Sequence, residues 1–349
     1  MIMDTKKVGN AISYLRKRAG YTQKDLADRI GISDKAVSKW ERGIGLPDIS
    51  YLSKLSILLD TDTDSLLSGD VIHHDKGWQG VLILEESPCG IGADTILFDK
   101  PLISYLLSYF LLVGIKKVFV VCQKKDETYI RSFLGDGSKL GICLFVFCAP
   151  IQTALLESQL DCDNLMIVYG RSLIYGVDQT RFFRKAMVHK DRLTILALPK
   201  KGSYLARKLA IDENRKVAGC NNKEILRTQY DYCDIPILFC PKNIFEQMAV
   251  SQNIPTFLFH YRKEHEIFVE MLDRGFVEIQ VNSWEDVNEA ATFIRIIQDK
   301  CGMNVYCIEE VAWRRGMISL EQLRILGENS PDLKYREYIL SLCEKAYIR

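Results

Sequence analysis

Residues 23–42, QKDLADRIGISDKAVSKWER, carry apolar positions at the spacing of two short helices joined by a tight turn. Ala27 is small enough to let a second helix approach, and Gly31 can take the positive φ that such a turn needs. The other apolar positions form a seam between the helices, and they are Ile32, Val37 and Trp40. The opposite face is polar, so the pattern predicts a helix-turn-helix.

Capping residues mark the starts of both predicted helices. Thr22 can cap the first helix, with Asp25 three residues later approximating a capping box. Ser33 or Asp34 can cap the second helix, and Asp34 could alternatively accept a hydrogen bond from cytosine. The spacing leaves these two roles of Asp34 open.

The second helix presents charged and hydroxyl side chains that can reach phosphates and base edges in a DNA major groove. A small helical bundle with a solvated basic face would show a similar helix. The distribution of charge favours DNA binding over a solvated helical face. Residues 1–42 hold ten Lys and Arg against five Asp and Glu, whereas residues 43–70 hold one Lys or Arg against five Asp and Glu. We predict double-stranded DNA as a partner, and the candidate contacts are Thr22, Gln23, Ser33, Asp34, Lys35, Ser38, Lys39 and Arg42.

From Gly80 onward, runs rich in β-branched residues alternate with helical segments. The predicted strands are residues 80–84, 117–122, 142–147, 164–169, 193–198, 235–240 and 276–281. The predicted helices are residues 101–114, 127–134, 151–160, 178–189 and 283–299. Such alternation predicts an α/β domain with a mostly parallel sheet flanked by helices, and after Cys301 the pattern predicts three closing helices.

These patterns divide the chain into four segments. Residues 1–68 form the helix-turn-helix domain, and residues 69–79, which include GDVIHHDKGWQ, form a linker. Residues 80–300 form the α/β domain, and residues 301–349 form its C-terminal helical segment. A chain of 349 residues with 48% hydrophobic residues can bury the cores of one small and one large domain.

Composition excludes several classes of protein. Apolar runs are interrupted by Pro, Gly, Ser and Tyr before they reach transmembrane length, and the start lacks a signal-peptide pattern, so we expect a cytoplasmic protein without a membrane partner. The eleven cysteines form no CxxC pair, and the five histidines show no metal-binding spacing. No nucleophile elbow is present. We therefore predict no metal site, no cofactor and no catalytic residue.

Two resemblances extend these conclusions. A first helix (VGNAISYLRKRAG), the helix pair and the segment GLPDISYLSKLSILLDTDTDSLL together resemble the Xre/Cro family of repressor-like DNA-binding domains, which implies an all-α domain of five helices. Three later segments are FDKPLISYLLSYFLLVGIKKVFVVC, FLGDGSKLGICLFVF and IEEVAWRRGMIS. They resemble sugar-phosphate nucleotidyltransferases, specifically glucose-1-phosphate thymidylyltransferases, which implies a Rossmann-like domain that assembles as a homodimer or homotetramer.

The chemistry of the resembled enzymes requires a glycine-rich phosphate loop with basic residues, a lysine for the sugar phosphate and two aspartates for magnesium. After the first strand, the loop instead carries Glu85, Glu86 and Pro88, which suit a triphosphate poorly. Arg171 and Gln280 stand where the resemblance implies the two aspartates. Lys223 could correspond to the sugar-phosphate lysine.

The sequence therefore predicts a sequence-specific DNA-binding transcriptional regulator that is not an enzyme. Its second domain is a catalytically inactive nucleotidyltransferase-like domain for oligomerisation, for sensing a nucleotide sugar or sugar phosphate, or for both. Arg171 could bind the ligand's phosphate or form a structural salt bridge, and Lys223 is the other candidate ligand contact. The alternative is a bifunctional or partner subunit of a sugar-1-phosphate nucleotidyltransferase.

Overall fold

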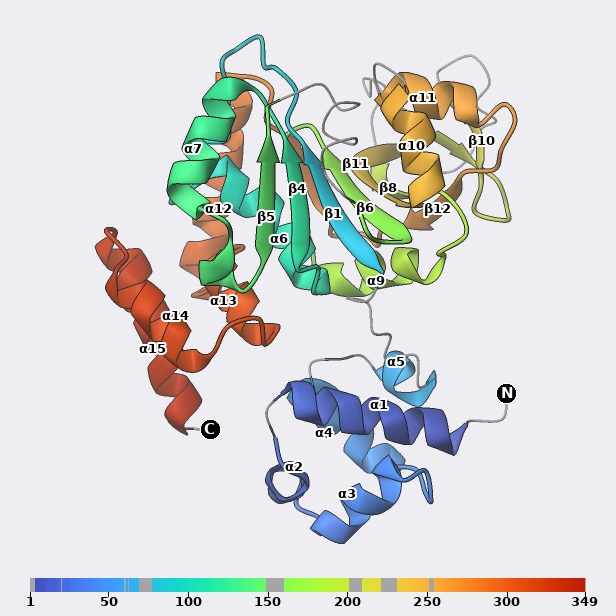
Figure 1. Ribbon diagram of the computed structural model, residues 1–349, viewed down its shortest axis with the longest axis vertical. Coiled ribbons are helices and arrows are strands. Elements are labelled where there is room, and N and C mark those ends of the chain that lie inside the picture. The colour runs from blue at the N-terminus through green and yellow to red at the C-terminus, as the bar shows by residue number, and fades with distance from the viewer. Residues whose placement is uncertain are drawn as a thin grey trace. The chain divides into compact units, whose positions relative to one another are not determined.

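A computed structural model describes residues 4–19, 21–59, 61, 63–68, 77–148, 160–200, 209–220, 231–250 and 254–348. Contacts divide the chain into two compact units, Met1–His74 and Asp75–Arg349, and each unit is described by itself (Figure 1). The larger unit's first strand begins at Trp78, so it includes the last two residues of the linker predicted at 69–79. Residues 69–76 of that linker lie outside the described part.

In the described part of the N-terminal unit, five helices form a bundle, as predicted. They are α1 Thr5–Arg18, α2 Gln23–Ile30, α3 Asp34–Glu41, α4 Ile49–Leu58 and α5 Thr63–Ser68. Their core includes the predicted seam positions Val37 and Trp40, whereas Ile32 is only partly buried against it. Ala27 is buried in the same core, which agrees with the prediction that its small side chain lets a second helix approach.

Among the described residues of the larger unit, nine strands form one mixed sheet. The strands are β1 Trp78–Ile83, β4 Lys117–Val121, β5 Cys143–Phe147, β6 Asn164–Tyr169, β8 Thr194–Lys200, β9 Leu209–Ile211, β10 Val217–Cys220, β11 Asp231–Pro241 and β12 Phe268–Met271. The order along the main path is β10-β9-β11-β6-β1-β4-β5, and β8 joins β11 to β12. Strands β6, β1, β4 and β5 are parallel, while β11 runs antiparallel to both β6 and β8.

Within the described ranges of the larger unit, two short sheets and several helices surround the central sheet. The short sheets pair β2 Ile96–Leu97 with β3 Lys100–Pro101 and β7 Ser172–Tyr175 with β13 Val277–Gln280. The helices are α6 Leu102–Val113, α7 Lys124–Leu134, η1 Ser138–Leu140, α9 Gln179–Val188, α10 Lys242–Val250, α11 Ile254–Tyr261, α12 Trp284–Cys301, α13 Ile308–Arg314, α14 Leu320–Glu328 and α15 Leu333–Ile348. Helices α6, α7 and α12 cover one face of the sheet, α10 and α11 cover the other, and α14 and α15 lie away from the sheet (Figure 1).

Alternation along the strands divides the core between the two faces of the sheet. Val120 and Leu144 pack with residues of α6, α7 and α12 on one face, whereas Phe119 packs with residues of α10 and α11 on the other. Helix α6 is buried almost throughout, and it approaches β1 so closely that a Cβ at Gly80 would lie 2.6 Å from the ring of Phe110. Glycine at this position allows the helix to reach the strand.

The predicted fold class is confirmed, with an all-α domain followed by an α/β domain and C-terminal helices. Each predicted strand overlaps an observed strand. The sequence pattern does not predict the short strands β7, β9, β10 and β12 or the helices α10 and α11. Of the helix predicted at 151–160, only Leu160 lies within the described residues.

Candidate nucleic-acid interface and the carboxyl edge of the sheet

The turn between α2 and α3 has the geometry that the sequence predicts. Thr22 caps α2, with its Oγ1 3.1 Å from the backbone N of Asp25, and the Asp25 carboxylate accepts from the backbone N of Thr22 at 2.8 Å. The Thr22 hydrogen bonds lower the pKa of Asp25. Gly31 ends α2 with φ of 86°, in the left-handed region that favours glycine. Local sequence thus determines how α2 ends and where α3 begins.

Ser33 is the cap of α3. Its Oγ accepts from the backbone N of Ala36 at 3.3 Å, while Asp34 is the first helical residue and accepts from the backbone N of Lys35 at 2.8 Å. The choice between Ser33 and Asp34 as the cap is therefore settled in favour of Ser33. A carboxylate in the first turn also suits the positive end of the helix dipole.

One face of α3 carries the predicted DNA contacts. Lys35, Ser38, Lys39 and Arg42 follow the i, i+3, i+4, i+7 spacing, which places them together along the helix. The two lysines and Arg42 are exposed and Ser38 is half-buried. Arg42 is at the C-terminal end of the helix, and its Nε donates to the carbonyl of Ser38 at 3.2 Å. This bond does not use the two terminal nitrogens of the guanidinium. This face therefore presents three cations and a hydroxyl.

A network of charged hydrogen bonds holds α3 against the two preceding helices, and sequence reasoning missed it. Glu41, at the end of α3, accepts from Nε of Arg16 in α1 at 2.5 Å and from Nε2 of Gln23 in α2 at 2.7 Å. Nη1 of Arg16 also donates to the carbonyl of Tyr21 at 2.6 Å. Gln23, predicted as a DNA contact, uses its amide within the domain.

The pKa of Glu41 reflects this network. Burial alone would raise the pKa, but the hydrogen bonds from Arg16 and Gln23 outweigh burial and hold it below its usual value. Glu41 is therefore ionised at neutral pH, and the charge pair has little contact with solvent. The contact joins residues 25 positions apart, so no local pattern could have indicated it.

The second candidate region is the carboxyl edge of the parallel strands β6, β1, β4 and β5. Parallel strands end at the same edge of a sheet, and ligands of open α/β sheets bind there. The loop after β1 reaches this edge with Glu85, Glu86, Pro88 and Cys89 exposed. Gly170 and Arg171 follow β6 at the same edge, and the backbone N of Gly170 donates to the carbonyl of Ile83 at 3.0 Å.

Arg171 reaches from the end of β6 to the loop after β1. Its side chain is buried, and Nη2 donates to the backbone carbonyl of Glu85, while within the described residues Nε has no hydrogen-bond partner. Burial lowers the pKa of Arg171, and the carboxylates of Asp126 and Glu85 oppose this shift. An arginine remains protonated in proteins, so a cation occupies this position.

Arg171 and Gln280 lie close together, although 109 positions separate them in the sequence. Strand β13 pairs with β7 so that Gln280 is opposite Ser172, and the backbone N of Val281 donates to the carbonyl of Arg171 at 2.6 Å. Gln280 is exposed. The structure thus brings together the two positions where the resemblance implies metal-binding aspartates. Among the described residues, no group of three His, Cys, Asp or Glu side chains could hold a metal ion.

Helix α7 fixes the other side of the loop after β1. Buried Asp126 accepts from the backbone N of Ala93 at 2.7 Å, and Lys125 lies 3.6 Å from the carboxylate of Asp94. A Cβ at Gly92 would lie 2.5 Å from Oδ1 of Asp126. The loop is therefore held by protein groups on both sides. Lys223, the remaining candidate ligand contact, lies outside the described residues.

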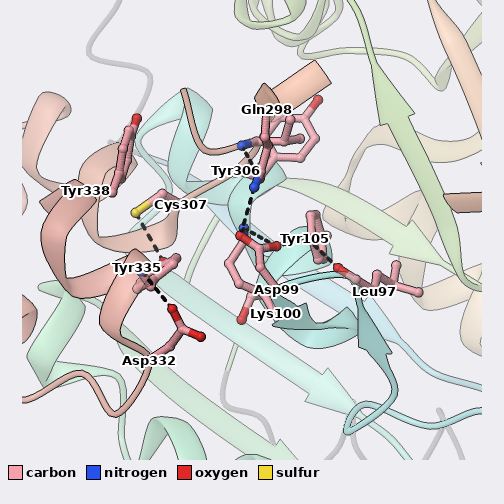
Figure 2. Close-up of polar contacts among 12 residues, drawn as sticks. Leu97, Asp99, Lys100, Tyr105, Gln298, Tyr306, Cys307, Asp332, Tyr335 and Tyr338 are labelled. Atoms are coloured by element: carbon pink, nitrogen blue, oxygen red, sulfur yellow. Dashed lines mark hydrogen bonds and ion pairs between the residues drawn. The ribbon is translucent and has the colours of Figure 1, made fainter. Parts of the chain in front are cut away.

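The FDKP segment, which follows the loop after β1, forms a buried polar cluster with residues of α6, α12 and α15 (Figure 2). Nζ of Lys100 is 2.7 Å from Asp99, which also accepts from the hydroxyl of Tyr105 at 2.7 Å and from Nε2 of Gln298 at 3.2 Å. The Lys100 ammonium lies 5.5 Å from the ring centroid of Tyr335 in α15. Almost all of the Lys100 side chain is buried, so this segment ties the β2–β3 hairpin to α12 and α15.

Comparisons with known proteins agree with both resemblances. Residues 12–66 match the sequence model of the helix-turn-helix family. Glucose-1-phosphate thymidylyltransferase of Neisseria meningitidis serogroup A is 27% identical over 262 residues, which cover 71% of this chain and 91% of that protein. The enzyme of Xanthomonas campestris pv. campestris is 24% identical, with 72% of this chain and 90% of that protein covered.

A solved structure shows the same fold. It is the crystal structure of a Bacillus anthracis protein assigned as a glucose-1-phosphate thymidylyltransferase, in complex with a sucrose, and it superposes with a TM-score of 0.52 at 14% identity. The superposition covers 62% of this chain and 95% of that one. Both predicted resemblances are thereby confirmed. No helix in the described part of the chain is long and apolar enough to cross a membrane.

Proposed function

We propose that this chain, a helix-turn-helix domain joined to a glucose-1-phosphate thymidylyltransferase-like domain, is a sequence-specific transcriptional regulator whose larger domain has lost nucleotidyl transfer. The observation that carries the proposal is the pair of Arg171 and Gln280 at the carboxyl edge, next to a loop bearing Glu85 and Glu86. Regulation requires DNA binding, for which the helix-turn-helix match and the exposed basic face of α3 are the support. We further propose that the protein acts in the cytoplasm.

For DNA binding, α3 would enter the major groove with Lys35, Ser38, Lys39 and Arg42 toward the duplex. Thr22, Ser33 and Asp34 would lie at the helix starts, where short polar side chains reach phosphates. Asp34 accepts a backbone hydrogen bond through Oδ1, so its second oxygen is the one available to cytosine. The amide of Gln23 is engaged by Glu41, so Gln23 would contact DNA only after exchanging that bond.

Substituting Lys39 or Arg42 by alanine should weaken specific DNA binding by about 1–3 kcal/mol for a base-edge contact, or reduce the salt slope by about one for a phosphate contact. Affinity is measured by fluorescence anisotropy on operator DNA over a range of salt concentrations. Lys54→Ala, an exposed lysine of α4, is the matched control and should retain affinity. Unchanged binding in both Lys39→Ala and Arg42→Ala would refute the placement of α3.

Loss of nucleotidyl transfer follows from charge. A magnesium ion about 4 Å from a guanidinium is repelled by about 8 kcal/mol at an effective dielectric constant near 20. Glu85 and Glu86 would repel a triphosphate, and Pro88 has no N–H to offer it. Without the metal and the phosphate cradle, in-line displacement loses both its charge stabilisation and its positioning.

We therefore expect no magnesium-dependent release of pyrophosphate when the protein is incubated with thymidine triphosphate and glucose 1-phosphate. An active glucose-1-phosphate thymidylyltransferase serves as the positive control, and product is followed by chromatography. Turnover that depends on magnesium would instead support the alternative of a bifunctional enzyme. Activation of an added, genuine nucleotidyltransferase by this protein would support the role of a partner subunit.

The larger domain would sense a nucleotide sugar or a sugar phosphate, with Arg171 and Lys223 as the proposed anion contacts. The Nε of Arg171, which has no hydrogen-bond partner among the described residues, is the feature that favours an anion there, whereas the bond from Nη2 to the carbonyl of Glu85 favours a structural role. Calorimetry with nucleotide sugars, nucleotides and sugar phosphates at millimolar concentration tests the sensor. Absence of any heat would remove sensing and leave oligomerisation as the domain's role.

Oligomerisation would bring two recognition helices to one DNA site. A homodimer or homotetramer can present two copies of α3 about 34 Å apart on a pseudo-palindromic operator. Light scattering of the free protein and of its DNA complex measures the assembly. A strictly monomeric protein in both samples would contradict this part of the proposal.

A further inference from the structure

Two cysteines stand at the ends of neighbouring parallel strands. In the β4–β5 pair, Val121 is opposite Phe147, and the backbone N of the next residue, Cys122, donates to the carbonyl of Phe147 at 3.0 Å. In a parallel ladder this bond continues the register by one position. Cys122 is therefore directly opposite Cys148.

Both side chains belong to the same face of the sheet. Val120 and Cys122 pack in the core that also contains Leu144 and Val146, and side chains two residues apart on a strand share a face. Cys148 is two positions beyond Val146. Neighbouring strands lie about 4.7–4.9 Å apart, which is within the range of about 4.4–6.8 Å between the Cα atoms of a disulfide. The register therefore places the Cα atoms of the two cysteines within the range that a disulfide spans.

The environments of the two thiols differ. Cys148 is exposed, whereas Cys122 is buried, and burial together with Asp126 and Glu127 raises the pKa of the Cys122 thiol to about 12. Lys124, in the first turn of α7, has a pKa raised first by Glu127 and to a smaller degree by Cys148, so its ammonium is near that thiol. Cys148 is exposed to solvent and Cys122 is not, so Cys148 has the access to react first.

We propose that Cys148 and Cys122 form an oxidisable dithiol, which hydrogen peroxide converts to an intrachain disulfide. The Cys148 thiolate attacks one peroxide oxygen, the O–O bond breaks, and hydroxide leaves as Cys148 becomes a sulfenic acid. The Cys122 sulfur then attacks the Cys148 sulfur, the S–O bond breaks, and water leaves with the proton that Cys122 gives up. The two sulfurs together lose two electrons, peroxide is reduced to two molecules of water, and a dithiol reductant reverses the change.

The site is distinct from the anion contacts proposed for Arg171 and Lys223, and it does not depend on DNA binding or on sensing. A disulfide would join the ends of β4 and β5 at the carboxyl edge of the sheet. Cys122 immediately precedes Gln123, which occupies the N-cap position of α7, and α7 holds the loop after β1 through Asp126. Oxidation would therefore restrain the helix that positions this loop.

The test uses the full-length protein, reduced and then treated with hydrogen peroxide, alkylated with iodoacetamide and digested with chymotrypsin. Trypsin would leave Cys143, Cys148 and Cys162 in one peptide, whereas cleavage after Phe147 and Leu155 isolates Cys148 in residues 148–155. Cys122 falls in residues 120–129. We expect one peroxide-dependent linked species of these two peptides, lighter by two hydrogens than their sum and absent after dithiothreitol treatment.

Variants separate this disulfide from unspecific oxidation. Cys143→Ser removes an exposed cysteine of the same strand that lies on the other face, and it should retain the link. Cys122→Ser should lose the link and accumulate a sulfenic acid at Cys148 that dimedone traps. If Cys122→Ser does not fold, the digest of the wild-type protein still shows whether Cys122 and Cys148 are linked. Alkylation of both cysteines after peroxide, or pairing of Cys148 with any other cysteine or chain, would overturn the proposal.

Discussion

Replacing Gly9 by alanine is expected to unfold the helix-turn-helix domain or to destabilise it by about 3 kcal/mol or more, because the new methyl group would meet backbone atoms. A Cβ at Gly9 would lie 2.2 Å from the carbonyl oxygen of Trp40, 3.0 Å from that of Glu41 and 3.0 Å from the backbone N of Gly43. Helix α1 would have to move away from the end of α3. DNA binding should then be lost together with the fold.

Hydrogen exchange of the full-length protein measures this effect, since peptides from α1 to α3 report the small domain separately from the larger one. Asn10→Ala is the matched control, because Asn10 is exposed on the same helix and alanine is the better helix former. Asn10→Ala should retain protection and DNA affinity. Native protection in Gly9→Ala would show that α1 and α3 do not approach this closely.

Glu41→Ala is expected to destabilise the same domain by about 3–5 kcal/mol, the range for removing one partner of a buried ion pair. The guanidinium of Arg16 would stay buried without its carboxylate, and the amide of Gln23 would lose its acceptor. Hydrogen exchange again gives the change in free energy of opening. The double variant Arg16→Met, Glu41→Leu should recover most of the loss, since apolar residues can replace a buried pair without leaving a charge. If Glu41→Ala alone were as stable as the wild type, the hydrogen bonds of Glu41 would not stabilise the domain.

The same pair makes the domain sensitive to acid. Hydrogen bonds hold the folded pKa of Glu41 below its usual value of 4.5, so its contribution to stability is complete above that pH and is lost as the pH falls through the folded pKa. Once the pH is below its folded pKa, Glu41 is protonated and resembles glutamine in charge. The stability difference between the wild type and Glu41→Gln should therefore be large at neutral pH and should narrow in acid, and an unchanged difference would argue against an ionised Glu41.

Local signals in the sequence predicted the helix-turn-helix well. A cap at Thr22, a left-handed turn at Gly31 and a small residue at Ala27 are each recognisable without knowledge of the partner helix. Gly9 lies inside a helical pattern, and no local signal in the sequence indicates that the end of α3 packs against α1 at this residue. The Arg16–Glu41 pair was missed for the same reason, because its partners meet only after three helices have packed.

In the larger domain, alternation located the buried strands but did not give their directions. The pattern of β11 resembles that of its parallel neighbours, although β11 runs antiparallel to β6 and β8. Strands of three or four residues, such as β7 and β12, are too short to show a period. The pairing of β7 with β13 nevertheless places Arg171 beside Gln280, two positions that only the family resemblance had connected. The ligand roles of Arg171 and Lys223 stay predictions.

The buried cluster around Lys100 has a consequence for the order in which the chain folds during synthesis. The ammonium of Lys100 packs near the ring of Tyr335, 235 residues later, so this part of the larger domain cannot be completed until the last helix has left the ribosome. The core of the helix-turn-helix domain, in contrast, has its partners between Val8 and Leu67. The DNA-binding domain can therefore reach its native state while the ribosome is still translating the rest of the message.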